Sequence, residues 1–148
     1  MTKINKMTKI KTSNFKRLIG IWKTEGTVYS HKDNLKLVGI DSYEFILDGN
    51  YILHKADVKM GNEKSETFEI ITLGSSIKKA NMQYYNSKGE SGIMTSSLTE
   101  NIFKIKGYKI KFEGTIDEEN TKLIGKWSLK ADNEKWTIFI NLKLTKQN

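Results

Sequence analysis

From residue 20 onward the chain alternates apolar and polar residues, and turn signals recur about every ten residues. This two-residue period is typical of β-strands that bury one face. A short turn over residues 13–18 is the one helical candidate. The pattern predicts ten strands, at residues 21–29, 36–47, 51–59, 64–73, 79–86, 91–98, 101–106, 108–115, 121–130 and 135–145.

The connections between these strands are short, so each strand is expected to pair antiparallel with the next. A meander of that many strands removes its unpaired edges most simply by closing. We therefore predict an all-β fold: an antiparallel, up-and-down, closed β-barrel of about ten strands with a short N-terminal helical turn. At 148 residues the chain has the size of one domain. We assign residues 18–148 to the barrel and expect residues 1–17 to form a basic, disordered arm.

The turn after the second predicted strand indicates which residues face the interior. Asp48-Gly49-Asn50 suits a hairpin, because these residue types tolerate positive φ angles. A two-residue loop there brings two apolar stripes onto one face. The stripes are Tyr43, Phe45 and Leu47 from one strand, and Ile52, His54, Ala56 and Val58 from the next.

The following turn sets the register of the strand at 64–73. Gly61-Asn62 resembles a type II′ turn, with glycine first, and counting back from it places His54 opposite Glu69. One extra loop residue would reverse the faces, so that Phe68 lines the core and Glu69 is solvated. We favour the first arrangement, because it follows from the turn and leaves Lys64 outside.

Two later turns set registers in the second half of the chain. Residues 86–89 predict a three-residue loop ending in a left-handed glycine, which pairs Met82 with Met94 and Tyr84 with Gly92. A loop over residues 131–134 sets the last hairpin. The pairs that this loop predicts are Leu129 with Trp136, Trp127 with Ile138, Gly125 with Ile140, and Leu123 with Leu142.

Composition excludes several kinds of chemistry. The chain has no cysteine and two histidines, which excludes disulfides, thiolate nucleophiles, Cys-ligated zinc and three-histidine metal sites. It has no glycine-rich phosphate loop and no nucleophile elbow. We therefore expect neither a metal nor a cofactor.

The net charge of +8 comes from the N-terminus. The first 17 residues hold six basic residues and no acidic one, which leaves 19 basic and 17 acidic residues, or +2, on residues 18–148. Arg17 is the only arginine, whereas phosphate and base recognition favour arginine. We do not expect a nucleic-acid partner, but an interaction module that uses the basic arm stays open as an alternative.

No apolar run approaches the ~20 residues of a membrane span. The N-terminus also lacks the apolar segment that a signal peptide needs. We expect no membrane span and a soluble, cytoplasmic protein.

The run from Gly20 to Gly26, with its Gly-x-Trp opening, resembles the start of lipocalin-like barrels of the calycin superfamily. It is most similar to a family of small, uncharacterised bacterial proteins in that superfamily. Further matches are 41–45 (DSYEF), 50–58 (NYILHKADV) and 68–71 (FEII). The resemblance implies a closed ten-strand barrel with an internal cavity, and it implies no established reaction.

The chain also departs from other calycins. Fatty-acid-binding proteins insert two helices between their first two strands, where this chain has only about residues 30–34. Secreted lipocalins have cysteines and an arginine over the opening tryptophan; this chain lacks both, and Lys143 or Lys146 would be a poor replacement for the arginine. Nitrobindins hold haem through a histidine on a late strand, and no histidine follows His54.

His54 is the titratable residue that stands out, because the face on which it lies is otherwise apolar. Burial would lower its pKa, while a facing carboxylate at Glu69 would raise it and orient the ring. Three interpretations stay open: a satisfied core pair, a ligand-binding pair, and a catalytic general acid–base pair formed by His54 and Glu69. The residues that we expect to line a ligand pocket are Tyr43, His54, Glu69, Tyr84, Met94 and Trp127.

The three tryptophans are interpreted as packing residues rather than cofactor platforms. Trp127 is the best pocket wall among them, since Gly125 beside it leaves room. Barrels larger than about eight strands enclose more space than their side chains fill. The leading hypothesis is therefore a barrel that binds a small, hydrophobic or amphipathic ligand in its interior. An isomerase or hydrolase that uses the His54–Glu69 pair is the alternative.

Overall fold

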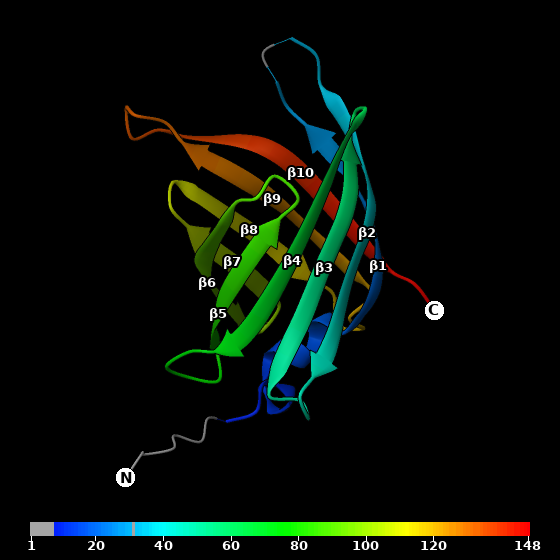
Figure 1. Cartoon of the computed structure of the whole chain (residues 1–148), viewed down its shortest axis with the longest axis vertical. Coiled ribbons are helices and arrows are strands. Elements are labelled where there is room, and N and C mark those ends of the chain that lie inside the picture. Colours follow the sequence, from blue (N-terminus) through cyan, green and yellow to red (C-terminus); the bar gives the residue numbers. More distant parts are fainter. Residues whose placement is uncertain (1–7, 31) are drawn as a thin grey trace.

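The computed structural model describes residues 8–30 and 32–148, so Lys3 and Lys6 of the predicted arm lie outside the described residues. Ten antiparallel strands form one closed barrel, in which neighbours in sequence pair and β1 pairs with β10 (Figure 1). The strands are β1 (Gly20–Val28), β2 (Leu35–Ile46), β3 (Tyr51–Met60), β4 (Glu63–Leu73), β5 (Lys79–Asn86), β6 (Ser91–Thr99), β7 (Ile102–Gly107), β8 (Ile110–Ile116), β9 (Lys122–Lys130) and β10 (Trp136–Lys146).

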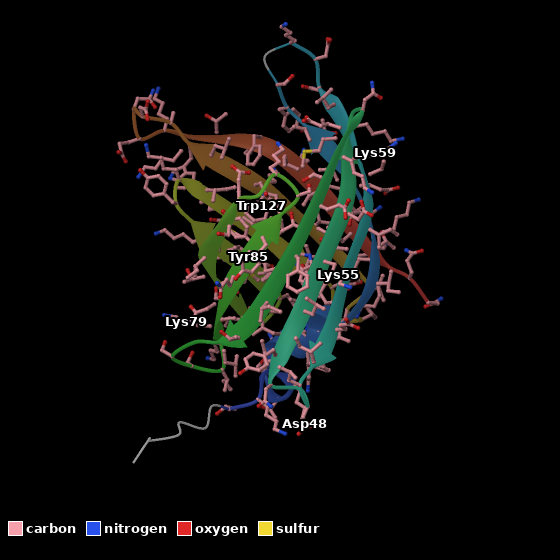
Figure 2. The ribbon with its side chains drawn as sticks, in the orientation of Figure 1. Asp48, Lys55, Lys59, Lys79, Tyr85 and Trp127 are labelled. Atoms are coloured by element: carbon pink, nitrogen blue, oxygen red, sulfur yellow. The ribbon has the colours of Figure 1, made fainter. Side chains whose placement is uncertain are left out.

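The predicted fold class is confirmed, and each strand begins and ends within two residues of its expected bounds. The two-residue period places one stripe of each strand inside the barrel. On β3, Val58 is buried whereas Lys55 and Lys59 are exposed on the outer face, where Figure 2 labels them.

The facing predicted for the first hairpin is confirmed, although its loop spans residues 47–50 and not two residues, and the register predicted for the second hairpin is confirmed. His54 pairs with Tyr43 on β2 and with Glu69 on β4. The odd residues of β4 therefore face inward, and Phe68 is 41% exposed on the outside. Between β5 and β6, the predicted pairing of Met82 with Met94 and of Tyr84 with Gly92 is confirmed as well.

The predicted register of the last hairpin is wrong. The loop between β9 and β10 spans residues 131–135, one residue longer than expected, and the backbone N–H of Ala131 donates to the carbonyl of Lys135. A bulge between Ile138 and Ile140 adds a second shift. Two shifts of one residue cancel in their effect on facing, so beyond the bulge Ile140 and Leu142 again lie on the same inner face as Trp127. The observed pairs are Trp136 with Lys130, Trp127 with Ile140, Gly125 with Leu142, and Leu123 with Leu144.

The prediction that Leu47 faces inward is also wrong, because Leu47 belongs to the turn. Its φ is 50° and Leu47 is 70% exposed. Phe45, predicted on the same stripe, is 38% exposed, so the buried stripe of β2 ends at Tyr43.

The N-terminal segment is the largest departure from the expected structure. Residues 10–18 form two short 3-10 helices, η1 (Ile10–Thr12) and η2 (Asn14–Leu18), which lie across one end of the barrel (Figure 1). Ile10, Phe15 and Leu18 are fully buried in the core. The expected disordered arm is therefore wrong for residues 8–17. The apolar residues that lie between the lysines cover one end of the barrel, because this packing buries apolar surface that an exposed arm would leave in water.

Arg17 ties this closed end together. Its guanidinium donates to the side chains of Asn120 (2.6 Å) and Asn101 (2.9 Å), and to the carbonyls of Glu100 and Asp117. These residues lie in the β6–β7 and β8–β9 turns. The only arginine of the chain is thus used inside the molecule, by its planar fork of donors.

Trp22 is fully buried at the same end, and its indole N–H donates to the carbonyl of Leu18 at 2.8 Å. Lys146 lies over the ring, with Nζ 4.8 Å from its centroid. The lysine expected to be a poor replacement therefore does occupy the position over the opening tryptophan. Among the described residues, no helix is both long enough and apolar enough to cross a bilayer.

Candidate functional site

A cavity of about 680 Å³ fills the barrel between the closed end and the opposite rim. Most of its lining is apolar, and the charged side chains in the lining are Asp41, His54 and Glu69. No lysine or arginine of the described ranges lines it. Tyr108 in the β7–β8 turn lines the rim and is 87% exposed, so the cavity reaches solvent there.

The cavity brings the predicted pocket residues together. Its lining includes all six of them: Tyr43, His54, Glu69, Tyr84, Met94 and Trp127. Their position follows from strand register, since each is an inward residue of its strand. Their expected roles in ligand binding and catalysis remain predictions.

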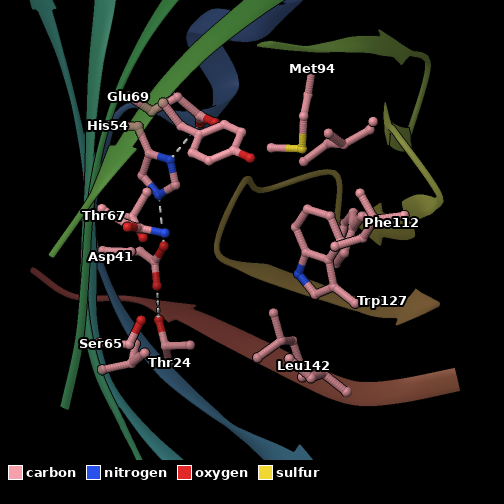
Figure 3. Close-up of a pocket in the computed structure, with 18 of the residues that line it drawn as sticks. Thr24, Asp41, His54, Ser65, Thr67, Glu69, Met94, Phe112, Trp127 and Leu142 are labelled. Carbon is pink, nitrogen blue, oxygen red and sulfur yellow. Dashed lines mark hydrogen bonds and ion pairs between the residues drawn. The ribbon is translucent and has the colours of Figure 1, made fainter. Parts of the chain in front are cut away.

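His54 is held between two carboxylates (Figure 3). Its Nδ1 lies 2.9 Å from Oε1 of Glu69, and its Nε2 lies 2.7 Å from Oδ2 of Asp41. The His54 side chain is 14% exposed, and those of Asp41 and Glu69 are 12% and 5% exposed. Three adjacent inward positions on β2, β3 and β4 therefore build one buried polar group, the Asp41–His54–Glu69 group.

Asp41 is the member of this group that the sequence prediction missed. Asp41 lies two positions before Tyr43 on β2, so the register that points Tyr43 inward also points Asp41 inward. Its direct partner on β3 is Ala56, and it reaches His54 along the diagonal between strands. The hydroxyl of Thr24 on β1 donates to the other Asp41 oxygen, Oδ1.

Tyr43 covers one face of the imidazole. The two rings are stacked, with centroids 4.0 Å apart and planes 3° from parallel. Burial, followed by the negative charges of Asp41 and Glu69, raises the pKa of Tyr43 well above its ordinary value. The phenol is therefore neutral around pH 7, and a neutral phenol hydroxyl can both donate and accept a hydrogen bond.

Opposing effects set the protonation of His54. Burial is the largest single effect and lowers its pKa, because it penalises the charged ring. Hydrogen bonds to Asp41 and Glu69, together with their charges, outweigh burial and raise the pKa of His54 from 6.5 to about 9. At neutral pH the ring is an imidazolium, with both N–H groups directed at carboxylates.

Aromatic rings form the opposite wall of the cavity (Figure 3). Trp127 packs on Phe112, with ring centroids 5.2 Å apart. The space that Gly125 leaves is occupied by Phe112: a Cβ at Gly125 would lie 2.3 Å from Cζ of that ring. The glycine was expected to make room for a ligand beside Trp127, but it makes room for Phe112.

The arrangement limits what the polar group can do. The two carboxylates sit on opposite sides of the imidazole, and no group of three or more His, Asp or Glu side chains within the described ranges has the geometry of a metal site. Both ring nitrogens are engaged, so His54 has no free lone pair with which to accept a proton. The group suits fixed electrostatic recognition better than proton transfer.

No protein-family model and no curated protein matches this chain. Solved structures do match it. One is the crystal structure of Rv2717c from M. tuberculosis, with a TM-score of 0.73 and 9% identity over 97% of this chain and 100% of that one. Another is the S-type phycobiliprotein lyase CPES from Guillardia theta, with a TM-score of 0.62 and 10% identity over 95% of this chain and 94% of that one. These likenesses concern the fold alone, and the closed ten-strand barrel fits the calycin-like fold expected from the sequence.

Proposed function

We propose that the protein binds a small, largely apolar ligand inside the barrel and orients its polar group at the Asp41–His54–Glu69 group. The observation that carries this proposal is the cavity of about 680 Å³, in which a mostly apolar lining holds its charged side chains in one group. Such a lining is the usual composition of a small-molecule site. A phycobiliprotein lyase with a similar barrel is consistent with this class of function.

The enzyme alternative makes His54 and Glu69 a general acid–base pair. A general base near neutral pH needs a free nitrogen and a pKa close to 7. Here both nitrogens have partners, and the pKa of His54 is raised to about 9. The contacts of His54 therefore favour ligand orientation over catalysis.

Two experiments on the purified protein test the proposal. Solvent extraction followed by mass spectrometry is expected to recover a small apolar compound from the folded protein. A neutral apolar dye that fluoresces in dry surroundings is expected to bind with a stoichiometry of one.

Ala56→Phe tests whether the dye enters the cavity. Ala56 lines the cavity beside Asp41, so a phenyl ring there would occupy ligand space. We expect dye affinity to fall by roughly tenfold or more, since this removes apolar burial of about 1.4 kcal/mol or more. Lys55→Phe is the matched control, because the neighbouring position is exposed on the outer face. Equal dye binding in both variants would contradict an internal site.

A further inference from the structure

The two hydrogen bonds of His54 determine the charge of the polar group. Each bond, to Asp41 and to Glu69, needs one hydrogen between its heavy atoms. If both hydrogens lie on the ring, the group has one cation and two anions. If one lies on a carboxyl, it has a neutral acid, a neutral imidazole and one anion. Both cases leave the group with a net charge of −1.

This charge has no counter-charge in the cavity wall. The lining contains no lysine or arginine of the described ranges, and its other titratable side chains, Tyr43, Tyr84 and Tyr108, are phenols. A buried net charge is unfavourable unless another charge or a set of hydrogen bonds compensates it. The cavity is thus negative although the whole chain carries +8.

The atom of the Asp41–His54–Glu69 group that is still free to form a hydrogen bond is a carboxylate oxygen, which is an acceptor. Asp41 uses Oδ2 for His54 and Oδ1 for Thr24, and Glu69 uses Oε1 for His54. The second oxygen of Glu69, Oε2, has no hydrogen-bond partner within residues 8–30 and 32–148, although Glu69 is only 4% exposed. The imidazolium cannot receive an anion, because both of its N–H groups are already donated.

Building on the proposed function, we propose that the polar group of the ligand is an organic ammonium ion, and that the free carboxylate oxygen of Glu69 receives it. An ammonium supplies the positive charge that the lining residues lack, together with N–H donors for Oε2 of Glu69. A ligand carboxylate would meet like charge and find no free N–H on His54. The same cavity would therefore discriminate between amphipathic molecules by the charge of their head group.

Three probes with the same ten-carbon chain test this inference: decylamine, decanol and decanoate, titrated at pH 7 in physiological salt by displacement of the neutral dye. We expect decylamine to bind about tenfold or more tightly than decanol, because a hydrogen bond between charged groups contributes enough binding free energy to account for a ratio of that size. Decanoate should bind more weakly than decanol. Decanoate binding as tightly as decylamine overturns the inference.

Glu69→Gln keeps the shape of the side chain and removes its charge. We expect this variant to lose the preference for decylamine and to keep the affinity for decanol within about threefold. Glu66→Gln is the matched control, because Glu66 is exposed on the outer face of the same strand, and it should keep the wild-type order. The inference is overturned if Glu69→Gln still prefers decylamine over decanol. If this variant does not fold, the wild-type series decides, and the absence of a preference for decylamine in it overturns the inference.

The outcomes separate this inference from the proposed function. Decanol and dye that bind without any preference for decylamine overturn the inference and support the proposed function. Failure of the dye and of all three probes to bind overturns the proposed function itself.

Discussion

The imidazole of His54 shows how a polar residue is accommodated on an otherwise apolar face. Removing water from the ring disfavours its charge, and two carboxylates at 2.7 and 2.9 Å more than compensate. Tyr43 then fixes the plane of the ring by stacking on it. Three contacts from the two neighbouring strands, namely two carboxylates and the face of the Tyr43 phenol, hold the ring in place as part of the cavity wall.

The raised pKa of His54 predicts a dependence of stability on pH. The pKa is 6.5 in the unfolded chain and about 9 in the folded protein, so the folded state holds the proton more tightly. The resulting stabilisation, about 3 kcal/mol, is fully present below pH 6.5 and is lost as the pH rises through 9. Urea unfolding between pH 6.5 and 9.5 measures it.

His54→Gln is the control for that titration. Its free energy of unfolding should stay nearly constant over the same pH window, because the titrating ring is gone. Parallel curves for the two proteins, or an NMR titration of the His54 ring with a midpoint near 6.5, would contradict the prediction.

The pair formed by His54 and Glu69 was predictable, and its third member was not recognised. A two-residue turn at Gly61-Asn62 converts directly into a cross-strand register, so the sequence carries that contact locally. The contact of Asp41 with His54 runs diagonally between strands and depends on side-chain reach. The alternation along β2 did place Asp41 on the inner face, because it lies two residues before Tyr43, and this was the signal available in the sequence.

At the scale of elements, hairpins differ in how much of their register a turn determines. The β3–β4 hairpin has a short turn and regular pairing, and its predicted register holds from Met60 to Ile52. In the β9–β10 hairpin, a five-residue loop and a bulge near Ile138 each shift the pairing. A bulge is a response to barrel curvature, which no local sequence pattern encodes.

The N-terminal 3-10 segment illustrates the same limit. Its lysines indicate an exposed arm, whereas Ile10, Phe15 and Leu18 find a barrel end to cover only once the strands have closed. The lysines of the segment are exposed, as their charge indicates, but the same segment also has a buried apolar face that the charge pattern does not predict.

Replacing Phe15 tests the role of this segment. Phe15 is fully buried in the main core, so Phe15→Ala should lower the free energy of unfolding by about 3–5 kcal/mol. Lys16→Ala is the adjacent exposed control and should change stability by less than about 0.5 kcal/mol. Urea denaturation measures both variants. Equal stabilities would mean that the segment does not contribute to the core.

At the scale of the whole molecule, the barrel is closed at one end and hollow towards the other. Core residues gather around Trp22, Ile52 and Ile71 next to the 3-10 helices, while the cavity occupies the rest of the interior. The number of strands and their closure were predictable from the meander. The size and charge of the cavity depend on which inward side chains lie side by side after closure, so they required the structure.

Because the cavity exists only in the closed barrel, its occupancy should stabilise the whole fold. A ligand that binds the native state alone adds about 2.7 kcal/mol at a concentration 100 times its Kd, which corresponds to a rise in Tm of roughly 5–10 °C for a chain of this size. We expect decanol at that concentration to produce this rise in the wild-type protein and in Lys55→Phe, measured by circular dichroism. Ala56→Phe should show little or no rise at the same decanol concentration, since its cavity is filled. A rise of equal size in Ala56→Phe would mean that the alcohol binds elsewhere on the fold.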